Sequence, residues 1–419
     1  MRMTLYLGAV VYGMAAETPK IRVTGDVYRN MRNPYMLKDY YRFRTIQMIK
    51  DNEIYGSSPP DIFVGRIGWP QVYVGPLVPP QLGDTSMLGT PEMWVNKTIP
   101  EIVEMRSLLI RGMHRTSVKN ADNGRVEEMI KEMALSEKYS NVDVKLKHAP
   151  TGAISFSENS QPFGPGAPLE SMRIENNNSD TRLEAAYEDD AMGASAAMLE
   201  LYEKGVEVSK IQRALAAGTL GRKGRRVFVP TRWSITAADD TISKAKLKAI
   251  KEYSPIDAVR IYENYSLDNR WIIMMVPGSW EYESMEAWYP NTTWNMNSKD
   301  IDLGASYEPF DGRKTYAEIG GCYYAARLAV SERLEALKGQ AKVIILREVH
   351  SGYIMPVGVW NVREHVREAL RTQPKVFSNL NEAVAYAASK LEIPIPVWMR
   401  NGKLLKRLFY QKVLSSYRF

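Results

Sequence analysis

The central part of the chain alternates apolar and polar positions with the period of an α-helix. Residues 100–112 open with a proline followed by a glutamate, a common start for a helix. Residues 123–139 place their apolar side chains near one face, and residues 181–217 continue in the same style up to a glycine-rich break at 218–224. The pattern predicts a series of amphipathic helices.

Short runs of β-branched and aromatic residues, bounded by glycine and proline, predict strands elsewhere. Two such runs lie in residues 57–80. Two more lie in residues 258–278 and are predicted to form a hairpin through Ser266–Asn269. Residues 342–349 and 353–360 are also typical of strands.

Residues 280–313 interrupt these patterns, because they are rich in aromatic and asparagine side chains but have little periodicity. We expect a long loop there. Helical periodicity returns in a helix from Tyr323 and in residues 361–371 and 378–391.

These elements predict a mixed α/β (α+β) fold. The loosest boundary is the expected loop, which divides the chain into a larger N-terminal region (residues 1–290) and a smaller C-terminal region (291–410) that can share one core. A flexible tail of residues 411–419 follows.

Composition narrows the setting of the protein. The 419 residues are 45% hydrophobic and 25% charged, which is enough for a large core, and the formal net charge of +7 suits an anionic partner such as nucleic acid. Cys322 is the single cysteine, so an intramolecular disulfide and cysteine-ligated zinc are excluded and a reducing, cytoplasmic location is expected. The apolar stretch at residues 5–16 is expected to fold rather than to act as a signal peptide, and no run reaches membrane-spanning length.

Familiar enzyme signatures are missing from the sequence. It contains no Walker loop, no GxSxG turn and no HExxH pair, and its four histidines, at 114, 148, 350 and 365, are not spaced as a metal cluster. The sequence motifs therefore do not predict a known catalytic mechanism.

Four long blocks, at residues 58–80, 229–244, 320–334 and 346–364, resemble the Nre family of archaeal DNA repair proteins. The resemblance implies a role in archaeal DNA repair with the sliding clamp (PCNA) as partner. Family members often carry an N-terminal cysteine pair of the zinc-ribbon kind, whereas the first residues here hold no cysteine. A contribution of such a zinc module to DNA binding is therefore not expected.

Arginines recur beside aromatic residues at several places. Guanidinium groups hold phosphates and aromatic faces stack on bases, so these residues are candidates for binding DNA or a nucleotide, although each also fits a structural role in a core. The candidates of this kind are Arg66, Trp69, Tyr73, Arg232, Trp233, Arg327 and Tyr353. A basic cluster adds Arg222, Lys223, Arg225 and Arg226.

Two functional hypotheses remain open. In the first, the protein is a repair factor without catalysis that binds DNA through its basic surface and docks on the clamp. In the second, it is an enzyme acting on DNA or a nucleotide, such as a metal-dependent nuclease using Mg²⁺ or a protein with a nucleotide or ADP-ribose-type site. The candidate catalytic groups are Asp239, Asp240, Glu348 and His350, with Glu318 as a further carboxylate. Asp239 and Asp240 also suit a helix N-terminus. If the arginine, aromatic and carboxylate candidates line one pocket, the enzyme hypothesis is favoured; if they form separate ion pairs, the repair factor without catalysis is favoured.

The last residues carry a short motif of their own. Gln411, Leu414 and Tyr417 recur at every third position and Phe419 ends the chain, which resembles the sliding-clamp-binding motif, although Arg418 interrupts its aromatic pair. The rival interpretation is a last helical turn packed on the core. Apolar residues between 404 and 409 can supply that anchor, so we predict that the tail itself docks on the clamp.

Overall fold

The computed structural model describes residues 51–415 except 152–153, 158, 176–177, 293, 296–298 and 354, and from residue 410 onward it describes the backbone alone. The stretch at residues 5–16 and the end of the chain from residue 416 lie outside this part. The strands are β1 (Glu53–Ser58), β2 (Ile62–Val64), β3 (Gln71–Val78), β4 (Ile110–Ser117), β5 (Ser140–Leu146), β6 (Gly166–Ile174), β7 (Val259–Ser266), β8 (Asn269–Pro277), β9 (Glu281–Trp288), β10 (Asp302–Glu308), β11 (Ala341–Val349) and β12 (Lys375–Phe377). The helices are α3 (Ile99–Ser107), α4 (Arg125–Leu135), α5 (Thr181–Glu188), α6 (Ala194–Glu203), α7 (Val208–Ala216), α8 (Thr231–Ile250), α9 (Gly321–Leu337), α10 (Trp360–Arg371), α11 (Leu380–Lys390), α12 (Ile395–Asn401) and α13 (Leu404–Ser415), with 3₁₀ turns η1 (Ser86–Gly89), η2 (Pro91–Met93) and η3 (Val118–Asn120).

The first sheet has six strands in the order β1-β5-β6-β4-β3-β2. Its pairs are antiparallel except β4 with β6, which run parallel. Helices α4 and α7 supply apolar side chains to the core on its inner face. On β3, Val72 and Val74 are buried and Tyr73 between them is exposed, as the two-residue period of a strand requires.

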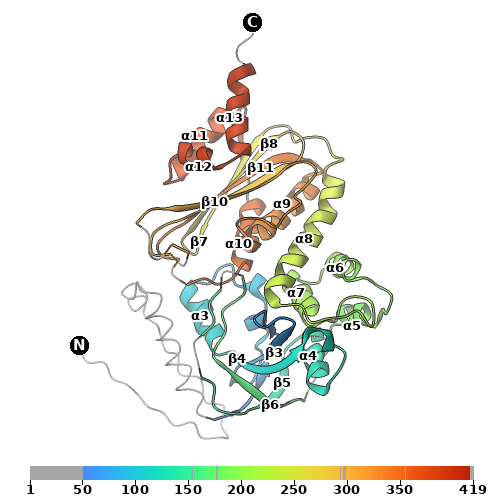
Figure 1. Ribbon diagram of the computed structural model, residues 1–419. Helices are drawn as coiled ribbons and strands as arrows, with labels where there is room; N and C mark the ends of the chain where they lie inside the picture. The colour runs from blue at the N-terminus through green and yellow to red at the C-terminus, as the bar shows by residue number, and fades with distance from the viewer. Residues whose placement is uncertain are drawn as a thin grey trace, which may run out of the picture.

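The second sheet also has six strands, in the order β10-β9-β11-β8-β7-β12. Figure 1 shows α8, α9 and α10 on one side of this sheet and α11, α12 and α13 on the other. The central strand β11 is buried on both faces: Val343 and Ile345 point to the first helix layer, and Ile344 and Leu346 to the second. A strand with apolar residues on both faces fits a three-layer arrangement.

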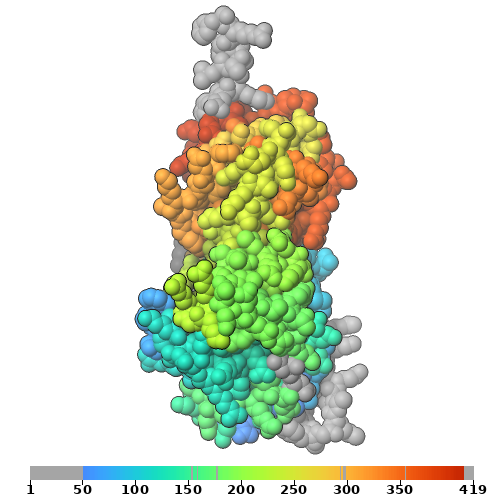
Figure 2. Space-filling model, turned by 90° about the vertical axis from the view of Figure 1, so that its right-hand side faces the viewer, coloured from blue at the N-terminus to red at the C-terminus, as the bar shows by residue number. Residues whose placement is uncertain are grey.

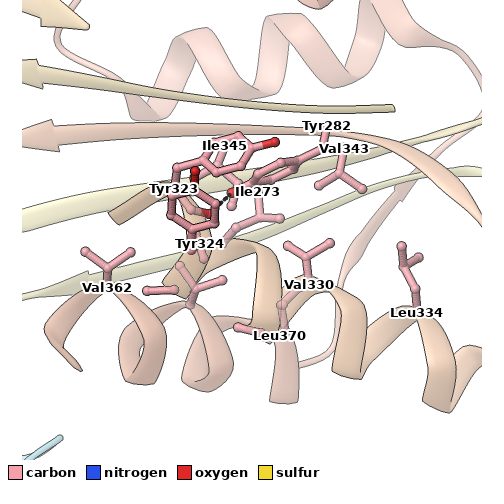
Figure 3. Packing of buried hydrophobic residues seen from close by; sticks show 14 of the residues in the cluster. Ile273, Tyr282, Tyr323, Tyr324, Val330, Leu334, Val343, Ile345, Val362 and Leu370 are labelled. Atoms are coloured by element: carbon pink, nitrogen blue, oxygen red, sulfur yellow. Dashed lines mark hydrogen bonds between the residues drawn. The ribbon is translucent and has the colours of Figure 1, made fainter. Parts of the chain in front are cut away.

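The core between the second sheet and its first helix layer is close-packed (Figure 3). Val330 and Leu334 on α9 face Ile345 and Val343 on β11 across this layer. The Tyr282 hydroxyl donates a 3.2 Å hydrogen bond to the backbone carbonyl of Tyr323, so that this buried phenol has an acceptor.

The two sheet regions share a packed boundary. Trp94 lies next to η2 and Trp360 lies on α10. Their rings pack edge to face, with 5.2 Å between the ring centres. Helix α8 packs on α7 on one side and on α9 on the other. In Figure 2 the green surface of α5–α7 lies directly between the blue-green first region and the yellow-to-red second region. Strands from both sides of residue 290 also pair in the second sheet, which confirms the mixed fold with a shared core.

Most of the predicted elements are confirmed. Helix α3 begins with a capping box in which Thr98 and Glu101 bond each other's backbone N–H groups. The hairpin β7–β8 turns through Leu267 and Asp268, both with positive φ.

Among the described residues, no helix has the length and apolar character needed to cross a bilayer.

Four predictions about secondary structure are wrong. The helix predicted for residues 100–112 ends at Ser107, and β4 begins at Ile110. Residues 280–313 hold strands β9 and β10 rather than one long loop. Residues 353–360 form no strand; they lead into α10 through Gly358, whose φ of +103° interrupts an extended chain. Asp239 and Asp240 do not begin a helix, because α8 already starts at Thr231 and both lie in its interior.

Candidate functional site: an arginine-lined groove

A groove of about 680 Å³ opens where the β2–β3 hairpin, β4, residues 151–166 and the start of α8 meet. The main chain of β2 is tied to α8, because the Val64 N–H donates a 2.9 Å hydrogen bond to the Thr231 hydroxyl. This bond sets the first turn of α8 beside the hairpin. Trp294 and Pro356 border the groove from the second region.

Three arginines line this groove from three different elements. Arg66 is in the hairpin loop, Arg111 is on β4 and Arg232 is the second residue of α8. Within the described part of the chain, none of the three has a carboxylate partner. Three guanidinium groups without counter-charge make the groove attractive to anions.

Arg111 is the most enclosed of the three. Its Nη2 donates a 2.8 Å hydrogen bond to the Tyr73 carbonyl, and its guanidinium lies 4.5 Å from the centre of the Phe63 ring. Burial lowers the pKa of Arg111 to about 10, so the group stays cationic at neutral pH. Its Nε is buried and has no hydrogen-bond partner among the described atoms. This cation is therefore held by aromatic faces and a single carbonyl.

The start of α8 adds to the positive potential. Pro230 precedes the helix, no side chain caps this end, and the first turn holds no acidic residue. The partial positive charge of the helix N-terminus is thus uncompensated by the protein at the point where Arg232 borders the groove.

Exposed aromatic rings stand at the same place. Tyr73, which lines the groove, is 42% exposed, and Trp69 and Trp233 beside it are 58% and 46% exposed. The Trp69 and Trp233 rings lie 6.5 Å apart and are tilted by 57°. Large apolar rings left in water next to unpaired cations are suited to stacking on nucleobases.

The predicted basic cluster is divided by the structure. Arg226 is buried: it donates to the carbonyls of Gly221 (2.8 Å) and Tyr187 (2.5 Å), so its role is structural. Lys223 pairs with Asp190 at 2.9 Å. Arg222 and Arg225 are exposed. Only the exposed members of this basic loop can offer charge to a ligand.

The candidate catalytic carboxylates do not converge. Asp239 is fully buried on α8, with Oδ1 at 3.1 Å from Arg363 Nη1 and 3.2 Å from Gln212 Nε2. Burial raises the pKa of Asp239 to about 6, against the opposing effect of Arg363. Asp240 instead pairs with Lys244 at 2.7 Å and with Arg327, which also holds Glu308.

The remaining candidates lie in the second region. Glu348 accepts backbone N–H groups from Glu392 and Ile393, at 3.1 and 2.7 Å. His350 stacks on Tyr289 at 4.7 Å; burial alone would lower its pKa, but the neighbouring carboxylates of Glu348 and Glu392 outweigh burial and raise it.

Tyr353 is buried, and its hydroxyl accepts the Val357 N–H at 3.3 Å. Glu318 is bound by Arg313 at 2.8 Å. No group of three or more potential metal ligands occurs among the described residues.

The structure therefore joins part of the predicted set. Arg66, Tyr73 and Arg232 line one groove, with Trp69 and Trp233 at its side, while the carboxylates are engaged in separate ion pairs and backbone contacts. Sequence reasoning missed Arg111, which sits in an apolar stretch that was predicted to continue a helix.

The fold and the groove together define a two-sheet α+β protein with an arginine-lined groove. The chain belongs to the archaeal Nre family: the family models described as "Archaeal Nre, N-terminal" and "Archaeal Nre, C-terminal" match residues 31–295 and 308–417. This confirms the resemblance found in the sequence.

Curated relatives agree with this assignment. The chain is 39% identical to "DNA repair protein NreB" of Archaeoglobus fulgidus over 86% of its length and 91% of that protein. It is 34% identical to "DNA repair protein NreA" of the same organism, over 86% and 91% of the two chains. It is 32% identical to "DNA repair protein NreA" of Haloferax volcanii, over 85% of this chain and 87% of the relative. No solved structure matches the fold.

Proposed function

We propose that this protein is a DNA repair factor that binds DNA in the arginine-lined groove and docks on the sliding clamp through its C-terminal tail. The names of its relatives support a role in DNA repair. The observation that carries the DNA-binding part is the set of three groove arginines without carboxylate partners in the described chain. We propose no reaction, because the carboxylate candidates are engaged in ion pairs and backbone contacts.

Bound DNA would use the groove in two ways. Arg66 and Arg232 contact backbone phosphates, and the helix end at Thr231 adds its dipole to the same site. Tyr73 and the adjacent tryptophans offer faces on which unpaired bases stack. Such contacts bind strands without reading base sequence.

The groove is tested by replacing Arg66 and Arg232 together with glutamine. Each lost phosphate contact should reduce the slope of log affinity against log salt by about 0.7 to 0.9, so the pair should lower it by about 1.5 and weaken binding at least about tenfold at low salt. Fluorescence anisotropy with a labelled oligonucleotide over a salt series measures both quantities.

The matched control is Arg371→Gln/Arg400→Gln, which removes two exposed arginines of the second region that also have no ion-pair partner within the described residues. A third variant, Arg222→Gln/Arg225→Gln, measures the share of the basic loop, which we expect to be smaller; Arg226 is kept because it is buried. Groove and control variants with the same affinity and slope would contradict the proposal.

Clamp docking is supported by the position of the last helix. Leu404 and Leu405 are buried at the start of α13, and Leu408 and Phe409 pack against the same core, so this helix is anchored as the sequence analysis required. Helix α13 points away from the first region (Figure 1). Gln411 and Leu414 belong to the part described by backbone alone, and Tyr417 and Phe419 lie beyond the described residues.

The tail is tested by ending the chain at Ser415, which keeps α13 at full length, and by Leu414→Ala/Tyr417→Ala in the full chain. A few buried apolar anchors dominate small interfaces, so each change should cost about 2 kcal/mol or more of clamp affinity. Calorimetry with the purified clamp measures this affinity. A folded chain ending at Ser415 that binds the clamp as tightly as the full chain would remove Tyr417 and Phe419 from the docking element. Unchanged affinity of Leu414→Ala/Tyr417→Ala as well would show that the tail is not the docking element.

A further inference from the structure

The loop of the β2–β3 hairpin, residues 65–70, places large apolar side chains in water. Ile67 is 86% exposed and Trp69 is 58% exposed. Single exposed apolar residues are ordinary on protein surfaces, but here an aliphatic and an aromatic side chain stand together at one hairpin tip. Ile67 and Arg66 both line the arginine groove, so the tip stands at its mouth.

The hairpin tip, meaning Ile67 and Trp69, is held in shape by backbone hydrogen bonds. The Trp69 N–H donates to the Arg66 carbonyl at 3.3 Å, and the Gln71 N–H donates to the Gly68 carbonyl at 2.9 Å. Gly68 has a φ of +85°, and a Cβ there would lie 2.8 Å from the Gln71 carbonyl oxygen, so the turn requires glycine.

Two contacts fix the tip to the rest of the first region. The carbonyl of Pro70 accepts the Val118 N–H at 2.9 Å, and the Trp69 ring packs near the ring of Trp233 on α8. The exposed side chains are therefore presented on an ordered turn, and little conformational entropy is lost when they bind.

The chemistry of the surroundings selects the partner. A purely apolar protein partner would leave the groove arginines unpaired, whereas DNA supplies phosphates for the arginines and base faces for the apolar tip. Some proteins that kink DNA insert aliphatic or aromatic side chains between base steps, which partly unstacks the bases. Ile67 and Trp69 have the character and the exposure for this role.

We propose that the hairpin tip is a wedge that inserts at the boundary between duplex and unpaired DNA, while the groove takes the unpaired strand. The inference rests on the proposed DNA binding in the groove and adds the preferred DNA structure. Insertion is easiest at such a boundary, because the last base pair is stacked on one side only. The wedge thus gives selectivity for forked or gapped DNA over intact duplex.

The test compares three DNAs of one sequence, a blunt duplex, a single strand and a fork, with 2-aminopurine at the last paired position of the fork. Wild-type protein should bind the fork about tenfold more tightly than the duplex, as the stacking of one base permits, and should raise 2-aminopurine fluorescence by unstacking it. Ile67→Ser/Trp69→Ala should lose both effects. Its affinity for the single strand should fall about tenfold or less, because one stacking face is lost while Tyr73, Trp233 and the groove arginines remain.

Two further variants make the result decisive. Ile67→Ser alone leaves the Trp69–Trp233 contact intact and should lose part of the fork preference. Val376→Ser on β12 removes an aliphatic side chain of similar exposure, 61%, at a distant edge and should leave the preference unchanged. Thermal melting of all variants should match wild type, since the replaced side chains are exposed.

The outcomes separate the two proposals. Loss of all DNA binding in Arg66→Gln/Arg232→Gln, with unchanged fork preference and 2-aminopurine signal in the tip variant, would retain the groove and overturn the wedge. Equal affinity of wild type for fork and duplex would overturn it as well. If wild type binds none of the three DNAs, the groove function and the wedge both fail, and the tip is better explained as a contact for a protein.

Discussion

Asp239→Ala should destabilise the protein by about 3 kcal/mol, because removal of one member of a buried ion pair leaves the other without full compensation. Asp239 and Arg363 are both almost completely buried, and their atoms approach to 3.1 Å. In this variant Arg363 still pairs with Glu364, whose carboxylate lies 2.9 Å from the guanidinium. The expected loss of stability is therefore at the low end of the range for buried ion pairs. Urea unfolding measures the loss. Because Asp239 is fully buried and does not line the groove, we expect this change to affect stability more than DNA binding.

The double variant Asp239→Ala/Arg363→Met supplies the control. Replacement of both charges by apolar groups is often close to neutral, so it should recover more than half of the loss. Arg232→Ala, at the second residue of the same helix, should change stability by less than about 0.5 kcal/mol, because its side chain has no ion-pair partner within the described residues. Equal losses for Asp239→Ala and Arg232→Ala would contradict this account.

Glu283→Ala should release the last helix. The Glu283 carboxylate, which is buried on β9, accepts the N–H groups of Lys403, Leu404 and Leu405 at 2.6, 3.1 and 3.0 Å and so caps α13 from a distant strand. Loss of these charge-assisted bonds should cost about 3 kcal/mol locally and speed amide hydrogen exchange in α13 about a hundredfold. Mass spectrometry of exchanged peptides covering residues 403–415 measures the rate.

Glu263→Ala is the matched change on the same sheet. Glu263 lies on β7 and binds Tyr386 at 2.7 Å on α11, so its loss should affect α11 and spare α13. If exchange in α13 is as fast in Glu263→Ala as in Glu283→Ala, the cap is not what holds the helix. Clamp binding measured on both variants would then also tell whether an anchored α13 is needed for the tail to dock.

The elements that could be predicted from the sequence are those whose pattern is local. Helix α3 has its capping residues within four positions, and the hairpin β7–β8 has its turn between two apolar runs. Strand β9 could not be found, because it is buried along nearly its whole length yet contains Glu283 and Glu286. The partners that make these carboxylates tolerable, the start of α13 and Arg347, are more than 60 residues away in the chain.

Part of the groove could be predicted from the sequence, because some of its residues lie in local patterns. Arg66 and Tyr73 stand out beside glycines and prolines in a short stretch of the sequence, and Arg232 directly precedes a tryptophan. Arg111 gave no signal, because its place among apolar residues is typical of a buried structural arginine. Its lack of a carboxylate partner within the described residues is a property of the folded arrangement.

The order of strands in the second sheet limits how this family can be rearranged. Strand β11 lies between β8 and β9, so a chain that stopped before β10 would leave β8 with one unpaired edge and β9 with no neighbouring strand. Exposed edges of this kind promote aggregation. The N-terminal and C-terminal segments therefore do not behave as interchangeable modules, and gene fission or segment exchange between family members would succeed only where the strands on both sides of the cut evolved together.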